Sequence, residues 1–110
     1  MIEVLEYLDR QGRSPFGNWF DQLERTTAAK VATALTRIGL GNLSNVKSVG
    51  GGALEYRIDY GPGYRVYFGR DGDTLVILLA GGSKKGQPKD IRDAKARWID
   101  YKQRKMRSKA

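Results

Sequence analysis

The 110-residue chain contains neither cysteine nor histidine. Without cysteine it can form no disulfide, no thiolate metal site and no cysteine nucleophile, which suits a reducing compartment. Without histidine it lacks the usual acid–base group of neutral pH, and a zinc site would need carboxylates alone, which zinc rarely accepts. We therefore expect a site that uses no metal and no cofactor.

Long apolar runs are also missing. No stretch approaches the roughly 20 apolar residues that cross a bilayer, and residues 1–10 mix acidic with apolar side chains, unlike a signal peptide. The sequence therefore predicts a cytoplasmic protein without a membrane partner. Because hydrophobic residues make up 40% of a short chain, we expect one domain with one core and a shallow, exposed site.

The positive charge is concentrated near the C-terminus. Residues 1–83 contain nine Lys or Arg and nine Asp or Glu. Residues 84–110 contain eleven Lys or Arg and three Asp, so the whole net charge of +8 lies there. A basic block on a neutral body is typical of a protein that binds a polyanion. The last residues can equally form a solubilising tail, and we divide the chain into a domain at 1–101 and a basic tail at 102–110.

The first half of the chain predicts one strand and two helices. Residues 2–7 are typical of a strand. Ser14 and Pro15 start a helix, because a capping hydroxyl precedes a proline at the first helical position. A second helix is expected to be capped by the threonine pair at 26–27 and to end near the glycines at 39–41. The apolar face expected for it is Ala28, Val31, Ala32, Leu35 and Ile38.

The second half predicts three strands and a final helix. Residues 42–52 are expected to form a loop, and residues 54–60, 64–69 and 74–80 to form the strands. The last strand is apolar throughout, as a strand covered on both faces is. A helix begins at Pro88 and continues into the basic tail. The order β-α-α-β-β-β-α predicts an α+β fold, with one mainly antiparallel sheet and helices packed on it.

Two arginines are expected to converge on one face of this sheet. If the turn between their strands is centred on Pro62, Arg57 and Arg65 become diagonal neighbours, roughly 7–8 Å apart at the backbone. Two planar, permanently charged guanidiniums suit a phosphate. Lys84 of the following Gly-rich loop can join them.

A structural role for the same charges is an equal alternative. In that register Asp59 lies opposite Arg65 and can pair with it, while Glu55 can neutralise Arg57 along the same strand. The residue pattern alone leaves phosphate binding and ion pairing open. On the same face, Tyr67 is the aromatic residue expected to stack on a base. The other residues expected to contact nucleic acid are Lys47, Lys85 and Lys89.

Residues 54–68 read Leu-Glu-Tyr-Arg-Ile-Asp-Tyr-Gly-Pro-Gly-Tyr-Arg-Val-Tyr-Phe and resemble the signature of the phage Gp49-like, HigB-related toxins. Residues 78–84 and 87–94 continue the resemblance, which covers nearly the whole chain up to about Tyr101. These relatives are addiction-module killer proteins of the RelE/ParE superfamily. The combination of motifs is specific to the subfamily, but the superfamily holds more than one activity.

The resemblance implies a RelE-like fold and the toxin of a type II toxin–antitoxin system. It also implies a ribosome-dependent, metal-independent endoribonuclease (an mRNA interferase), in which Arg57, Arg65 and Lys84 bind and polarise the scissile phosphate. The implied partners are mRNA on the ribosome and a cognate antitoxin, a helix-turn-helix protein encoded beside the toxin. Two other functions stay open, a ParE-like inhibitor of DNA gyrase and a non-catalytic nucleic-acid-binding module.

The sequence departs from the family pattern in two respects. The family loop Gly-Gly-Asp-Lys has Ser83 at the aspartate position here, and Lys85 follows as an additional basic residue. The C-terminal histidine or catalytic tyrosine of some relatives is missing. The expected mechanism is attack by the RNA's own 2′-hydroxyl, with the two arginines stabilising the phosphoryl charge and Lys84 or Lys85 as the base.

Overall fold

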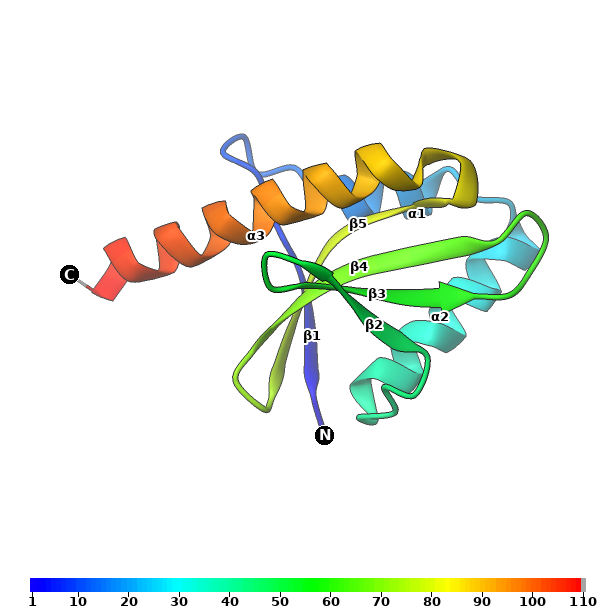
Figure 1. The fold of residues 1–110 in the computed structure, drawn as a ribbon, viewed down its shortest axis with the longest axis horizontal. Coiled ribbons are helices and arrows are strands. Elements are labelled where there is room, and N and C mark those ends of the chain that lie inside the picture. The colour runs from blue at the N-terminus through cyan, green and yellow to red at the C-terminus, as the bar shows by residue number, and fades with distance from the viewer. Residues whose placement is uncertain (110) are drawn as a thin grey trace.

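The computed structural model describes residues 1–109, and the side chains of residues 1–108. In chain order its elements are β1 (Glu3–Glu6), α1 (Pro15–Asp21), α2 (Arg25–Gly39), β2 (Val46–Gly50), β3 (Ala53–Ile58), β4 (Tyr64–Asp71), β5 (Leu75–Ser83), a 3-10 turn (Lys84–Gly86) and α3 (Gln87–Lys109) (Figure 1). The strands form one sheet in the order β1-β5-β4-β3-β2, in which β1 is parallel to β5 and the other neighbours are antiparallel. The predicted α+β class with a mainly antiparallel sheet is confirmed.

Strand β2 lies where the sequence predicted a loop, so the fold has one strand more than expected. It pairs with β3 at the edge of the sheet, and Val46 and Val49 are its partly buried residues. A short edge strand with two apolar residues lacks the alternation that identifies strands in a sequence. The glycines at positions 50–52 all have positive φ angles and form the turn between β2 and β3.

Helices cover both faces of the sheet (Figure 1). α1 and α2 pack on one face and α3 on the other, so β4 and β5 are buried on both sides. For β5 this burial was predicted from the apolar run at residues 74–80. The core on the α1 and α2 side is formed by Phe16, Val31, Ala34, Ile38, Tyr56, Ile58, Val66, Phe68, Val76 and Leu78. The core beneath α3 is formed by Tyr7, Ala53, Tyr67, Ile77, Leu79, Ala80, Ala94 and Trp98.

The two predicted N-terminal helices are present in the structure, but the second begins earlier than the sequence predicted. Ser14 caps α1 as expected, because its Oγ accepts a hydrogen bond from the Gly17 backbone N–H at 2.8 Å. α2 begins at Arg25, before the threonine pair, and Thr27 faces the core. Its buried positions are Thr27, Val31, Ala34 and Ile38. Ala32, which was expected in the core, is exposed because this buried face is rotated away from it.

The hairpin of β3 and β4 has a different register from the one predicted. The strands pair so that the turn is centred on Gly61 and not on Pro62. Positive φ angles of 56° at Gly61 and 86° at Gly63 allow the chain to reverse there. Arg57 therefore lies directly opposite Arg65 instead of diagonal to it.

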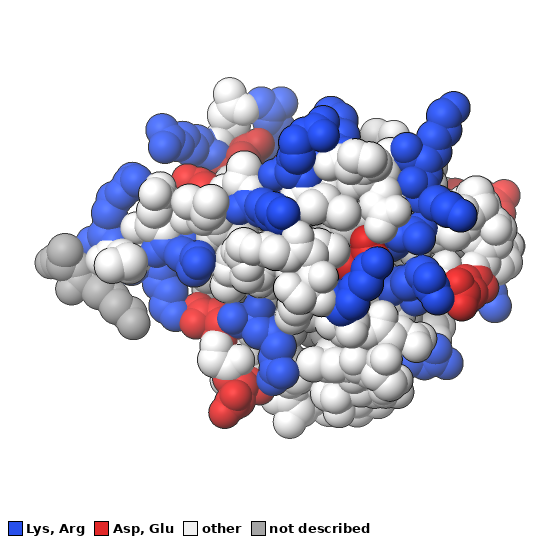
Figure 2. Space-filling model, in the orientation of Figure 1, with Lys and Arg blue, Asp and Glu red and all other residues white. Residues whose placement is uncertain are grey.

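α3 carries much of the basic block across one face of the sheet. It runs without interruption from Gln87 to Lys109, so residues 102–109 continue the helix. Figure 2 shows Lys and Arg side chains along this helix and at the end of the sheet near the β3–β4 turn. None of the helices that the structure describes combines the length and apolar composition of a membrane span.

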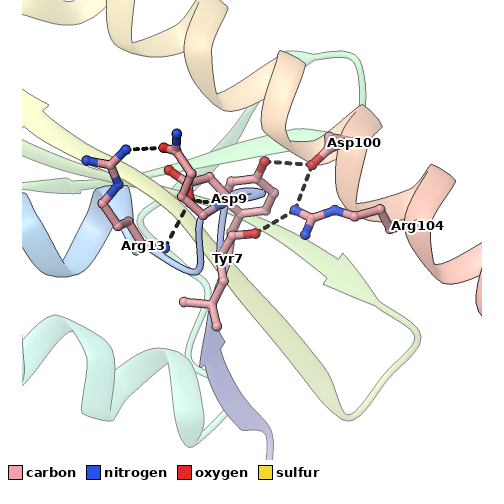
Figure 3. A network of polar contacts seen from close by, with 7 residues as sticks. Tyr7, Asp9, Arg13, Asp100 and Arg104 are labelled. Atoms are coloured by element: carbon pink, nitrogen blue, oxygen red, sulfur yellow. Dashed lines mark hydrogen bonds and ion pairs between the residues drawn. The ribbon is translucent and has the colours of Figure 1, made fainter.

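Asp100 attaches the C-terminal half of α3 to the segment that follows β1 (Figure 3). Its carboxylate accepts a hydrogen bond from the Tyr7 hydroxyl at 2.7 Å and pairs with Arg104 at 2.6 Å. The Arg104 guanidinium also donates to the Leu8 carbonyl at 2.5 Å and lies 5.1 Å from the centre of the Tyr7 ring. These contacts hold the C-terminal half of α3 to the rest of the fold, beyond the last residue that α3 contributes to the core.

Asp71, at the end of β4, makes a second attachment for the same helix. It accepts a hydrogen bond from the Tyr101 hydroxyl at 2.8 Å and another from Lys105 Nζ at 2.6 Å. Lys105 lies within the stretch that the sequence assigned to a basic tail. At least two basic residues of that stretch, Arg104 and Lys105, therefore bind the folded body.

Candidate functional site

The structure brings Arg57, Arg65 and Lys84 to the walls of one hollow. The two arginines lie opposite each other on β3 and β4, and the turn at residues 61–63 closes one side. Lys84 joins them because its backbone N–H donates a hydrogen bond to the Gly63 carbonyl at 2.9 Å. The hollow has a volume of about 320 Å³. The three residues predicted to be catalytic are thus neighbours in space.

The two arginines differ in burial. The Arg57 side chain is 59% exposed, whereas the Arg65 side chain is 8% exposed. Arg65 Nε lies 3.7 Å from Glu55 Oε2, and no described residue accepts a hydrogen bond from Nε or Nη1. Buried donors without acceptors cost free energy, and Nη2 is the guanidinium nitrogen left to Arg65 for contact with an anion in the hollow.

Glu55 is a buried carboxylate beneath the hollow, with 1% of its side chain exposed. Its partners come from three other elements. Lys47 Nζ of β2 lies 3.6 Å away, Arg65 comes from β4, and Gln87 Nε2 of α3 donates a hydrogen bond at 2.8 Å. A buried charge is tolerated only with such partners. Glu55 therefore holds one wall of the hollow together from below.

The ion pairs predicted from the sequence are exchanged in the structure. Arg57 Nε pairs with Asp59 Oδ1 at 3.5 Å, and Arg65 pairs with Glu55. The predicted pair Asp59–Arg65 is wrong because the turn is centred one residue earlier than expected. The predicted pair Glu55–Arg57 is wrong because Glu55 pairs across the strands with Arg65 instead. The Asp59 side chain is 87% exposed, so its pair with Arg57 contributes little and leaves that guanidinium available.

Tyr67 lies away from the surface. It is fully buried opposite Glu55, in the core that α3 covers with Ala94 and Trp98. Burial, and then the nearby Glu55 carboxylate, raise the pKa of the Tyr67 hydroxyl well above its ordinary value. A base cannot reach this ring beneath α3, so the stacking role predicted for Tyr67 does not fit the structure.

The three lysines predicted to contact nucleic acid do not line the hollow. Lys47 is 67% exposed and is held on the β2 side by the buried carboxylate. Lys85 is exposed in the 3-10 turn that follows β5. Lys89 is 73% exposed and pairs with Asp93 along α3 at 2.7 Å. The structure therefore leaves these three lysines as exposed cations outside the hollow.

Asp90, in the first turn of α3, is an acidic neighbour of the site that the sequence did not single out. It lies over Gly82, the β5 partner of Arg65, where a Cβ would be 1.9 Å from Asp90 Oδ2. Burial raises the pKa of the Asp90 carboxyl. The signal that could have revealed this contact is the glycine pair at the end of an apolar strand, which marks a close approach.

Two comparisons relate the chain to known proteins. The model of a family described as phage-derived protein Gp49-like matches residues 18–99. An uncharacterized protein of Haemophilus influenzae is 46% identical over 81 residues, which cover 73% of this chain and 82% of that protein. The segment matched by the family model contains all three cations of the hollow.

Proposed function

The chain belongs to the phage-derived Gp49-like family, a branch of the RelE/HigB-like toxin superfamily, and on that premise we propose that it is a ribosome-dependent mRNA endoribonuclease. Membership places it among the toxins of toxin–antitoxin systems and implies an antitoxin as its partner. The antitoxin proposed here is a helix-turn-helix protein encoded beside the toxin. The chemistry of the hollow supports the choice of RNA as substrate.

The observation that carries the proposal is the convergence of Arg57, Arg65 and Lys84 on one hollow. The exposed Arg57 guanidinium can donate two parallel hydrogen bonds to phosphoryl oxygens, and Arg65 adds a donor through Nη2. Because Glu55 holds Arg65 from below, that donor is oriented before the substrate arrives. Preorganised donors aimed at developing charge are often the largest single contribution to catalysis.

The proposed reaction uses the RNA's own 2′-oxygen as nucleophile and needs no metal to generate one. A bond forms between this oxygen and phosphorus while the bond from phosphorus to the 5′-oxygen breaks. The products are a 2′,3′-cyclic phosphate and a 5′-hydroxyl end. Arg57 and Arg65 stabilise the charge on the non-bridging oxygens. Lys84 or Lys85 takes the 2′-hydroxyl proton, and solvent water donates a proton to the 5′-oxygen as it leaves.

The shape of the site supports the proposed dependence on the ribosome. The hollow is shallow and has no deep pocket to orient a flexible strand, although holding reactants in line is worth a large part of a reaction barrier. Messenger RNA on the ribosome is already held in a fixed conformation. The protein then has to supply only cations and proton transfer.

Induction of the chain in bacteria tests the proposal. Growth should stop, and coexpression of the neighbouring antitoxin should restore it. Primer extension on total RNA should show new 5′ ends inside translated regions, and these ends should disappear when translation is blocked beforehand. The Arg57→Ala chain, which removes an exposed cation of the hollow, should produce neither effect.

Two outcomes would count against RNA cleavage. Normal growth at high expression of folded protein would reject toxicity altogether. Growth arrest with intact mRNA and accumulated gyrase-linked DNA breaks would instead identify a gyrase inhibitor on the same fold.

A further inference from the structure

A second hollow continues the first on the α2 side of the sheet. Its volume of about 290 Å³ is close to the lower limit for ligand pockets, roughly 300 Å³. Arg57, Asp59 and Tyr60 line both hollows, so the two are continuous around the end of β3. The other walls are formed by Lys30, Thr33 and Arg37 of α2 and by Asn45 before β2.

Cations dominate the walls of this second hollow. Lys30 and Arg37 lie two turns apart on one side of α2, and both are exposed. Neither forms an ion pair with another residue in the part of the chain that the structure describes, and Arg57 adds a third positive charge. Asp59 is the acidic residue of the lining, and it already pairs with Arg57. The hollow therefore attracts a ligand that carries negative charge.

Neutral groups of the same hollow favour a nucleotide over other anions. Lys30 Nζ lies 5.3 Å from the centre of the Tyr60 ring, so a cation and an aromatic ring form one wall. Proteins bind single-stranded nucleic acid with this combination, cations for the backbone and rings for the bases. Asn45 and Thr33 add groups that can bond base edges or a 2′-hydroxyl. An acidic peptide without aromatic residues would use the cations but would place no ring against Tyr60.

We infer that the second hollow binds the nucleotide next to the scissile phosphate, so that the RNA strand runs from Lys84 past Arg57 onto α2. That the phosphate bound by Arg57, Arg65 and Lys84 is the one that is cleaved rests on the function proposed above. Lys30 and Arg37 hold the neighbouring backbone phosphate, and the base lies against Tyr60. Binding on both sides of Arg57 fixes the strand at two points and aligns the 2′-oxygen for attack.

Binding of an uncleavable RNA tests this subsite apart from catalysis. The probe is a short fluorescein-labelled single-stranded RNA with 2′-O-methyl groups, and its anisotropy is measured over a series of salt concentrations. Lys30→Ala/Arg37→Ala should weaken binding. The slope of log affinity against log salt should become shallower by about 0.7 for each phosphate that the variant no longer neutralises. Asp59→Asn should tighten binding, because the opposing carboxylate is removed.

The matched control is Arg10→Ala/Arg25→Ala, which removes the same charge from exposed positions outside both hollows. It should keep the slope of the unmodified chain. The inference is overturned if the unmodified chain does not bind the RNA, or if both double variants weaken binding equally. Loss of inhibition by the antitoxin with unchanged RNA binding would assign the hollow to the protein partner and overturn it as well.

The same experiment separates the subsite from the proposed function. RNA binding that depends on Lys30 and Arg37, in a chain that cuts no mRNA in cells, would keep the nucleotide site and reject the nuclease. Cleavage that persists in Lys30→Ala/Arg37→Ala with unchanged RNA affinity would keep the nuclease and reject the subsite.

Discussion

At the scale of single residues, Arg57 and Arg65 share a proposed role but differ in what their loss does to the fold. Arg65 is buried against Glu55, and breaking a buried ion pair costs on the order of 3 kcal/mol. Loss of activity in Arg65→Ala would therefore mix chemistry with stability. Arg57 is 59% exposed, so its substitution separates the two effects.

We predict that Arg57→Ala cuts mRNA in the presence of ribosomes roughly 10²–10³-fold more slowly, the usual cost of one donor to the transition state. Its free energy of unfolding should change by about 1 kcal/mol or less, because the ion pair that it removes is exposed. Arg57→Lys should also be slow, since a point charge does not replace a bidentate donor. Asp59→Ala is the control, because it removes the ion-pair partner but keeps the guanidinium, and its kcat should not fall. A folded Arg57→Ala chain with full activity would exclude Arg57 from the mechanism.

Glu55→Gln tests whether the buried carboxylate positions Arg65. The amide oxygen can still accept the hydrogen bond from Gln87, but the charge that holds Arg65 is gone. A displacement of about 1 Å can cost up to 10²-fold in rate, so kcat should fall while KM changes less. Lys47→Ala, which removes the exposed partner of the same carboxylate, should keep kcat. An unchanged kcat in Glu55→Gln would reduce Glu55 to a structural role.

The sequence could identify the cations of the hollow but not their buried partners. Arg57, Arg65 and Lys84 follow from strand alternation and from the motif, both of which are local in the chain. The burial of Glu55 and Tyr67 depends on where α3 crosses the sheet, and this packing has no local signal. An alternating strand shows which residues share a face, but it does not show which part of that face a helix covers.

At the scale of elements, the long periodic segments were predictable and the register between them was not. The β3–β4 turn contains Gly61-Pro62-Gly63, and centring it on either of the first two residues agrees with the sequence. A shift of one residue in the centre of a turn moves every cross-strand pair. Strand β2 was missed because Val46 and Val49 are too few to give a period.

The attachment of α3 at Asp100 predicts a pH dependence of stability. The hydrogen bond from Tyr7 holds the pKa of the Asp100 carboxyl below its ordinary value, and Arg104 adds to the effect. Because the folded-state pKa is the lower one, ionised Asp100 stabilises the fold above the unfolded value, and this contribution is lost as the pH falls. Asp100→Asn should therefore melt earlier than the unmodified chain at pH 7, with the gap closing below about pH 4. Thermal melts across this range measure the gap, and a constant gap would contradict the prediction.

At the scale of the whole molecule, the basic block of the sequence is both part of the fold and part of the surface. Arg104 and Lys105 bind the body through the Leu8 carbonyl and Asp71. Other cations of α3 are exposed and extend the positive face that Figure 2 shows. Composition alone could indicate a polyanion partner, but it could not divide the block into these two groups, because each contact joins residues far apart in the chain.

Two variants separate structural from surface charge in residues 102–110. A chain that ends after Tyr101 loses both anchoring cations, so we predict a lower melting temperature than that of the full chain. Arg107→Gln removes an exposed charge and leaves the anchors in place, so its melting temperature should stay nearly unchanged. RNA binding should weaken in this second variant if the helix end contacts the polyanion, with a shallower salt dependence. Equal melting of the shortened and full chains would show that these residues are a free tail.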